Sequence, residues 1–147
     1  MSGRKFFAST IEIAAEPAVI FAILANPHRH PEIDGSGTLN ADIEGPERLK
    51  LGDSFTVQVT QRRRFSYETI NTVIEFEENR RIAWKHKGPQ IWRYELEPAG
   101  QGTTRVTETF DYSRYGPIAF IIGFLFRKNR ESMDETLRRL KEIAEAA

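Results

Sequence analysis

Most of the chain alternates apolar and polar residues with the two-residue period of a β-strand. The stretch from Phe6 to Ile13 is rich in β-branched and aromatic residues and predicts the first strand. Further alternating stretches follow, separated by turn signals such as Gly88-Pro89; they centre on residues 39–43, 55–59, 70–76, 82–86, 92–96 and 106–112. In the 70–76 stretch, Ile70, Ile74 and Phe76 are expected on one face. Short connections between strands with one apolar face predict an antiparallel meander.

A first helix is predicted directly after the first strand. Pro17 suits the first turn of a helix, where the amide hydrogen that proline lacks has no partner. Apolar residues recur with helical spacing at positions 20, 21, 23 and 24. Pro27 disfavours helical geometry at Asn26, so the helix should end there. The following segment is typical of a turn-rich connection with one short helical turn, and residues 35–37 are expected to form a flexible loop.

A final helix is predicted from near Pro117 to about Ala144, and its two halves differ. The first half, Ile118 to Phe126, is almost wholly apolar, whereas the second carries one apolar stripe at positions 133, 137, 140 and 144 among charged residues. The apolar half is too short to cross a bilayer, which takes about 20 residues. We therefore expect a buried segment, a cavity wall or a membrane-surface contact, with a bend at Gly123, because glycine weakens a helix.

The order of elements predicts an α+β fold and a single domain over residues 1–147. Strand, short helix, about six antiparallel strands and a long helix pack most simply as one curved sheet of about seven strands wrapped around the C-terminal helix. A curved sheet and one helix leave space between them wherever side chains are not large. Ligand binding or chemistry is expected in that cavity.

Composition narrows the functional classes. The 147 residues include 21 Lys plus Arg and 21 Asp plus Glu, so the net charge is zero and gives no footprint for nucleic acid. The run Arg62–Arg64 is interpreted as a solvated strand end or hairpin turn. The absence of cysteine excludes disulfides, thiolate metal sites and cysteine nucleophiles. The first ten residues lack the apolar core of a signal peptide, so a cytoplasmic location is expected.

No residue spacing points to a metal or a cofactor. A Ser-His-Asp set, a glycine-rich phosphate loop and paired carboxylates at fixed spacing are all missing from the sequence. We expect no metal and no cofactor. Two isolated candidates for acid–base chemistry remain, Glu108 and His86.

Glu108 occupies the apolar register of its strand, between Val106 and Phe110. Burial in an apolar pocket would raise the pKa of its carboxyl group and suit it to general acid–base catalysis. The alternatives are a strand irregularity that turns Glu108 to solvent and a buried pair with an arginine. His86 shares a face with Trp84; it either orients a ligand or is a rim histidine without chemistry.

Aromatic residues on facing strands are the candidate ligand contacts. Tyrosine and tryptophan combine large contact area with one hydrogen-bonding group, although packing of the core alone would also use them. Tyr94 and Tyr112 are the preferred polar contacts. The full set expected to bind a ligand is Trp84, Trp92, Tyr94, Phe110, Tyr112, Phe55, Val57, Phe120 and Phe124.

Four stretches, in this order, resemble the START-like or SRPBCC superfamily. They are STIEIAAEPAVIFAILANPHRHPEI, VIEFEENRRIAW, WRYELEPAGQGTTRVTETFDY and LRRLKEIAE, and together they cover nearly the whole chain. The resemblance implies a helix-grip fold around an apolar pocket for a lipid-like or aromatic ligand. It also implies that Ile118 to Phe126 lies across the mouth and floor of the pocket as a gate. The superfamily has no shared catalytic motif, so the resemblance assigns no activity.

Three functions remain open at this point. The first is storage or transport of a hydrophobic small molecule such as a lipid, isoprenoid, quinone or polyketide. The second is a polyketide cyclase or dehydrase that uses cavity acid–base residues. The third is docking of the apolar half-helix on a protein or a membrane surface. A monomer and a homodimer both fit the sequence.

Overall fold

A computed structural model describes residues 5–61, 65–86 and 88–147, and it contains one antiparallel sheet. The strands are β1 (Phe6–Ile13), β2 (Leu39–Glu44), β3 (Ser54–Gln61), β4 (Phe65–Glu77), β5 (Arg81–Lys85), β6 (Ile91–Pro98) and β7 (Thr104–Asp111). They pair in the order β1-β7-β6-β5-β4-β3-β2. The first strand therefore closes onto the last, and the others follow one another as the predicted meander. The run Arg62–Arg64 lies outside the described residues.

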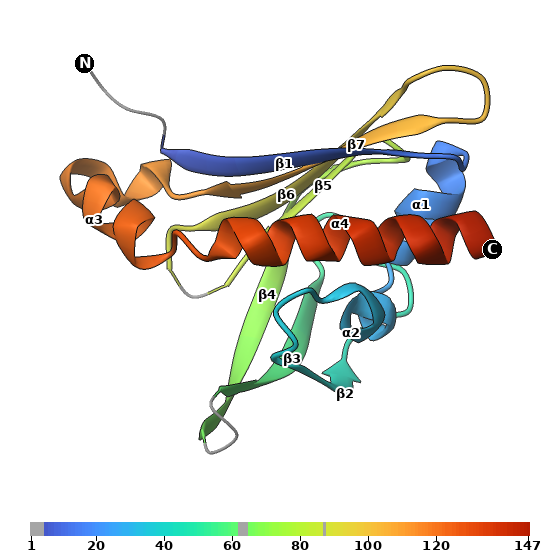
Figure 1. The fold of residues 1–147 in the computed structure, drawn as a ribbon. Coiled ribbons are helices and arrows are strands. Elements are labelled where there is room, and N and C mark those ends of the chain that lie inside the picture. The colour runs from blue at the N-terminus through green and yellow to red at the C-terminus, as the bar shows by residue number, and fades with distance from the viewer. Residues whose placement is uncertain (1–4, 62–64, 87) are drawn as a thin grey trace.

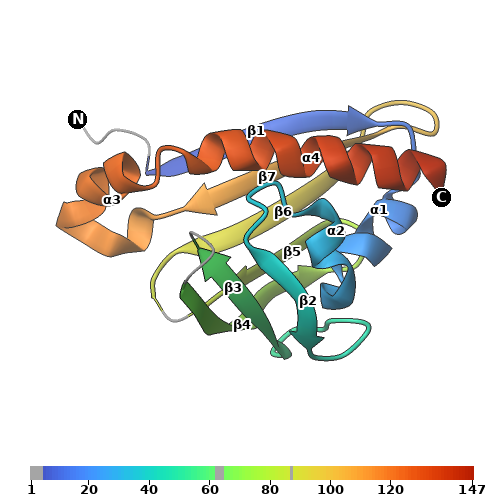
Figure 2. The same cartoon turned by 60° about the horizontal axis from the view of Figure 1, so that its bottom comes forward.

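Helices cover one face of the sheet. The helical elements are α1 (Pro17–Leu24), η1 (Pro27–Arg29), α2 (His30–Ile33), η2 (Ser113–Ile118), α3 (Ala119–Leu125) and α4 (Asn129–Ala146). Helix α4 runs along the limb formed by β1, β7 and β6, while β2, β3 and β4 turn away from it (Figure 1). Helices α1 and α2 lie near its C-terminal half (Figure 2). This arrangement confirms the predicted helix-grip fold.

The main core lies between α4, α1 and the concave face of the sheet. The stripe predicted on α4 is buried, and so are the apolar residues of α1; the buried set includes Ile20, Phe21, Ile23, Leu24, Met133, Leu137, Leu140 and Ala144. The Asn26 side chain accepts a hydrogen bond from the His28 amide at 3.1 Å and caps η1. A cap of this kind satisfies an amide that the short helix leaves unpaired.

The expected face of β4 is wrong in its first half. Val73 pairs with Trp84 and Glu75 with Ala83, so Ile74 is an extra residue that forms a β-bulge. Before the bulge Asn71 and Val73 face the core, and Ile70 is exposed. After it, the inward face shifts by one residue. An unbroken two-residue alternation cannot predict this change of face.

The final helix is broken where the sequence predicted one continuous helix. Helix α3 ends at Leu125 and α4 begins at Asn129, so residues 126–128 separate them. The bend expected at Gly123 is wrong, because Gly123 lies inside α3. A Cβ atom there would stand 2.7 Å from the hydroxyl oxygen of Tyr112, so glycine permits close packing. The break lets Ala119 pack near Tyr112 at the end of the sheet while Met133 continues the buried stripe of α4.

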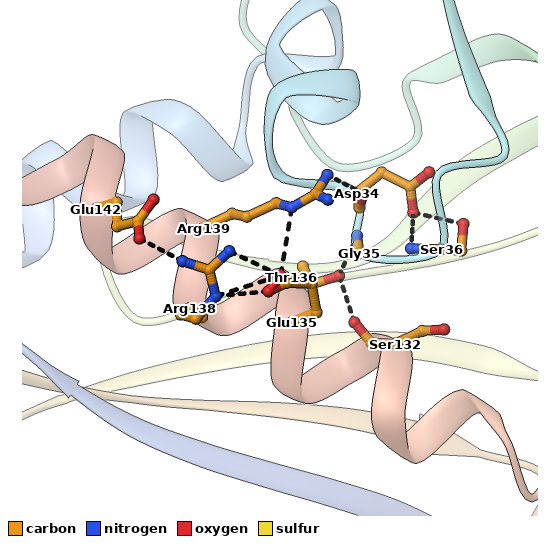
Figure 3. Close-up of polar contacts among 9 residues, drawn as sticks. All are labelled: Asp34, Gly35, Ser36, Ser132, Glu135, Thr136, Arg138, Arg139 and Glu142. Carbon is orange, nitrogen blue, oxygen red and sulfur yellow. Dashed lines mark hydrogen bonds and ion pairs between the residues drawn. The ribbon is translucent and has the colours of Figure 1, made fainter.

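The loop after α2 is tied to α4 rather than loosely attached (Figure 3). The Gly35 amide donates to the Thr136 hydroxyl at 2.8 Å, and the Arg139 guanidinium donates to the Asp34 carbonyl oxygen at 2.7 Å. A Cβ atom on Gly35 would stand 2.2 Å from the Ser132 carbonyl oxygen. This close approach fixes one wall of the space between sheet and helix.

Within the described residues, none of the helices combines the length and the apolar character that crossing a bilayer requires.

Candidate functional site

A cavity of about 490 Å³ lies between the concave face of the sheet, the α2 loop and the first turns of α4. Small-molecule sites usually have volumes of about 300–1,000 Å³. Strands β3 to β7 contribute inward side chains, because successive residues of a strand point to opposite faces. The helical side adds Ile33, Met133, Ser132 and Thr136. The space left between a curved sheet and one helix is therefore open to a ligand.

One wall of the cavity is a cluster of aromatic rings around Trp84. The His30 ring stacks on Trp84 with centroids 4.9 Å apart, and Phe55 meets Trp84 edge-on at 5.5 Å. The Tyr94 ring lies 5.7 Å from the Trp84 ring, tilted by 36°. Edge-on and offset contacts of this kind are favoured between aromatic rings. This wall is closely packed and mostly apolar.

A second aromatic group lies toward α3. Trp92 and Phe110 are paired residues on β6 and β7, with ring centroids 4.6 Å apart. Phe126, in the segment between α3 and α4, approaches Phe110 at 5.6 Å. Of the apolar segment 118–126, Phe126 is the residue that lines the cavity, so the segment does not cover the mouth and floor as the resemblance implied.

Glu108 is buried on the cavity wall and exposes 3% of its surface. It faces Tyr94 across the β6–β7 pair, and the Tyr94 hydroxyl donates to its Oε2 at 2.8 Å. Burial raises the pKa of Glu108 to about 8; the Tyr94 hydrogen bond lowers this pKa, and the charges of Asp34 and Asp134 raise it. Burial also raises the pKa of Tyr94 well above its usual value. The partner is thus a tyrosine, neither solvent nor the arginine considered from the sequence.

The second oxygen of Glu108 is unsatisfied. Among the described residues, Oε1 is the one buried side-chain nitrogen or oxygen without a hydrogen-bond partner. Buried polar atoms nearly always have a partner, so an exception in a cavity wall calls for an explanation.

His86 belongs to a separate polar chain at the cavity edge. The Tyr115 hydroxyl donates to Gln90 Oε1 at 2.5 Å, and Gln90 Nε2 lies 2.7 Å from His86 Nε2. The Gln90 amide group therefore donates to His86, which places the imidazole hydrogen on Nδ1. Burial lowers the pKa of His86, so the ring is neutral at pH 7.

His30 is neutral as well. Its Nε2 lies 2.8 Å from the Leu24 carbonyl oxygen and donates to it. Burial lowers the pKa of His30 to about 4.

The structure brings most of the expected site residues together. The cavity wall includes Glu108, His86, Trp84, Trp92, Tyr94, Phe110, Phe55 and Val57. Tyr112, Phe120 and Phe124 lie outside it: Tyr112 packs against Phe7 and Phe110, and the other two are on the exposed surface of α3.

Sequence reasoning did not select several polar residues of the wall. The bulge at Ile74 hid the inward register of Asn71. Gln90 precedes its strand and carried no signal in the sequence. Asp34 and Thr136 reach the same wall because the loop after α2 bonds to α4, through Gly35 to Thr136 and through the Asp34 carbonyl to Arg139, and the spacing of residues along the chain does not reveal these contacts.

The chain matches the model of a protein family over residues 6–145. That family is described as "Polyketide cyclase / dehydrase and lipid transport". The chain belongs to this family. The match confirms the resemblance stated from the sequence, and membership indicates binding of a hydrophobic ligand.

The chain is also similar to a curated protein and to solved structures that share its fold. A Mycobacterium tuberculosis protein named "Uncharacterized protein Rv0088" is 35% identical over 140 residues, with 90% of this chain covered; the chain spans 61% of that relative's length. A polyketide-cyclase-like protein of Corynebacterium glutamicum has 26% identity and a TM-score of 0.56, with 99% of this chain and 88% of that one covered. A Rhodobacter sphaeroides protein has a TM-score of 0.74 at 18% identity, covering 99% and 96%. The Aha1 dimer of Colwellia psychrerythraea has a TM-score of 0.67 at 18% identity, covering 95% and 96%.

Proposed function

We propose that this protein binds a hydrophobic small molecule in the cavity between the sheet and α4, and that it stores or carries this molecule. The observation that supports the proposal is the cavity itself, about 490 Å³ of open space with walls of aromatic and aliphatic side chains. An isoprenoid, a quinone, a polyketide or another lipid has the apolar surface to fill it. Burial of that surface supplies the binding free energy, at about 25 cal/mol per Å². The proposal concerns residues 1–147 as one binding domain.

A carrier fits the polar groups of the wall better than an enzyme does. Glu108 is bonded to Tyr94, and His86 is bonded to Gln90; no described hydrogen bond joins the two groups. General acid–base catalysis usually places a proton donor and an acceptor within hydrogen-bond reach of the same substrate. Separate, neutral polar groups are instead suited to orienting a ligand.

A cyclase or dehydrase is the second candidate, and one observation favours it. Glu108 lies in the wall with a pKa raised by burial to about 8, near the value that a general acid needs at neutral pH. The Glu108→Gln substitution separates the two functions. An enzyme would lose turnover and keep ligand binding. A carrier would bind its ligand as before and would show no turnover in either protein.

The proposal is tested by native mass spectrometry of the protein purified gently from its own host. We expect a bound species that dissociates on activation, and its mass separates a quinone from a polyketide or another lipid. Trp92→Ala should lower ligand occupancy about tenfold, because a large cavity contact is lost. Leu51→Ala is the matched control, since Leu51 is exposed and outside the cavity. An empty protein that takes up no compound from an apolar panel would overturn the proposal.

A further inference from the structure

We propose that the cavity selects an uncharged ligand with an oxygen atom, such as a ketone, a quinone or an alcohol, and that this oxygen binds Glu108 Oε1. The inference rests on the proposed function and names the class of ligand for the same site. Its basis is the unsatisfied carboxyl oxygen of Glu108. Oε2 of Glu108 accepts the hydrogen bond from Tyr94, and Oε1 has no partner in the described structure.

The carboxyl group is suited to donate from Oε1. Burial raises its pKa to about 8, so most molecules carry a proton on Glu108 at pH 7. The charged or titratable groups that act on it are Tyr94 on β6, Asp34 in the loop after α2 and Asp134 on α4. Because Oε2 already accepts a hydrogen bond from Tyr94, the proton belongs on Oε1. A carboxylic acid hydroxyl is a donor, and a carbonyl or hydroxyl oxygen of a ligand can accept from it.

The charge of the described part of the wall disfavours an anionic ligand. No described residue of the cavity wall is a lysine or an arginine, and its two acidic residues are Asp34 and Glu108. The imidazoles of His30 and His86 are neutral, because burial lowers the pKa of each. A carboxylate or phosphate ligand would lose its water of hydration without gaining a counter-charge, and such burial is costly. Burial of an uncharged carbonyl or hydroxyl oxygen costs much less free energy.

The test compares three probes of equal chain length at pH 7, namely decan-2-one, decan-1-ol and decanoate. Each displaces the neutral dye Nile red, whose fluorescence reports occupancy of the cavity. We expect the ketone and the alcohol to bind at least about tenfold more tightly than decanoate, because the wall offers a hydrogen bond and no cation. Glu108→Leu should weaken decan-2-one about tenfold; the Nile red affinity of each variant is measured separately, because the dye carries a carbonyl oxygen of its own. Glu108→Gln is the matched control, since its amide N–H can still donate.

The outcomes distinguish failure of the proposed function from failure of the inference about Glu108. If Nile red and all three probes fail to bind the wild-type protein, the proposed function falls. If they bind and decanoate equals the ketone, or if Glu108→Leu keeps full ketone affinity, the proposed function stands and this inference is overturned. Circular dichroism and the melting temperature show that each variant is folded.

The surface of α3 carries a second, independent inference. Most apolar side chains of α3 and of the residues that flank it are exposed: Phe120 exposes 75% of its surface and Phe124 64%, and Ile121 and Leu125 of α3 and the flanking Ile118 and Phe126 are exposed as well. Exposed apolar patches of this density usually mark an interaction site. The neighbouring charges are mainly basic, from Arg114, Arg127, Lys128 and Arg130, with Glu131 as the one acidic residue of the 113–131 segment.

We infer that α3 docks on an anionic lipid bilayer. An apolar helix face flanked by basic side chains is complementary to such a surface, because the aromatic rings enter the interface while the cations meet lipid phosphates. None of the four basic residues forms an ion pair in the described part of the chain. Arg127 donates to the Phe124 carbonyl oxygen at 2.8 Å, and its guanidinium lies 4.3 Å from the centroid of the Phe124 ring, so a cation and an exposed aromatic ring stand side by side. Phe126 links the surface to the cavity wall, so a ligand would enter from the bilayer side.

Flotation with vesicles tests this surface. We expect binding to vesicles of 70% phosphatidylcholine and 30% phosphatidylglycerol, weak binding to pure phosphatidylcholine, and loss of binding at high salt. Phe124→Asp should reduce the bound fraction at least about fivefold, because a charge is costly at the apolar interface. Leu51→Asp is the matched control, with the same 64% exposure on another part of the molecule. No vesicle binding, or a dimer that Phe124→Asp dissociates without any vesicle binding, would overturn the inference.

Discussion

Glu108 lies at the point where the apolar wall and the polar groups of the cavity meet. Its neighbours on β7 are ordinary core residues, and a carboxyl group at the same register costs free energy unless it is protonated or bonded. One hydrogen bond from Tyr94 offsets part of this cost. Protonation, which the raised pKa of Glu108 favours, offsets another part. The sequence identified Glu108 as unusual, because it interrupts an apolar face. It could not identify Tyr94 as the partner, since that contact depends on the register of β6 on β7.

The raised pKa of Glu108 predicts that stability falls as pH rises. The ordinary pKa of 4.5 describes the unfolded chain and the value of about 8 the folded one, so the folded state holds more protons between these values. The stabilisation is complete below pH 4.5 and is lost as pH rises through 8, on the order of 5 kcal/mol in all, of which about 3 kcal/mol falls between pH 5 and pH 8. Urea unfolding at pH 5 and pH 8 measures it. Glu108→Gln is the reference, and an equal difference between the two proteins at both pH values would contradict the prediction.

Two elements of the structure owe their positions to glycines that allow a close approach between distant segments. Gly123 lets α3 pack against the Tyr112 hydroxyl, and Gly35 lets the α2 loop touch the backbone of α4. The sequence interpreted the first as a bend and the second as part of a flexible loop. Both readings used the local freedom of glycine, whereas the structure uses its lack of a side chain. A contact between distant segments is not visible in the sequence next to either residue.

Gly35→Ala should lower the free energy of unfolding by about 2–4 kcal/mol, because the new methyl group would overlap backbone atoms that cannot move aside. The nearest of these are the Ser132 carbonyl oxygen at 2.2 Å and the Thr136 amide nitrogen at 2.7 Å. Ser36→Ala is the control in the same loop; it removes one exposed hydroxyl and should cost less than about 1 kcal/mol. Chemical denaturation of both variants measures the difference. A Gly35→Ala protein as stable as the control would show that the loop can leave α4.

At the scale of the whole molecule, the sequence predicted the fold correctly wherever one period of apolar and polar residues continued through a whole helix or strand. Strands β3, β6 and β7, the stripe of α4 and the helix after β1 follow directly from such patterns. The pattern failed at the bulge of β4 and at the break before α4, where a single residue or a short segment changes the direction of the chain. The aromatic rings that β3, β5, β6 and β7 add to the cavity wall were predictable, because they lie on the inward faces of regularly alternating strands. Glu108 and His86 were also predicted, whereas Asn71, Gln90 and Thr136 were not, since a bulge or contacts between distant segments bring them into the wall.

The difference in burial between α3 and α4 predicts that the two helices differ in local stability. In α3 the one fully buried side chain is Ala119, whereas α4 buries Met133, Thr136, Leu137, Leu140 and Ala144. Local opening costs little where few apolar contacts are lost, so hydrogen exchange in segment 117–126 should be at least about a hundredfold faster than in segment 133–144. Exchange followed by mass spectrometry at pH 7 measures both segments in one protein, and the buried strand β7 serves as the internal standard. Equal protection of the two segments would mean that α3 is held by a partner or by a second copy of the chain. Fast exchange in α3 beside a protected α4 would instead mean that the exposed apolar helix opens without disturbing the core, as a helix that docks and releases at a membrane must.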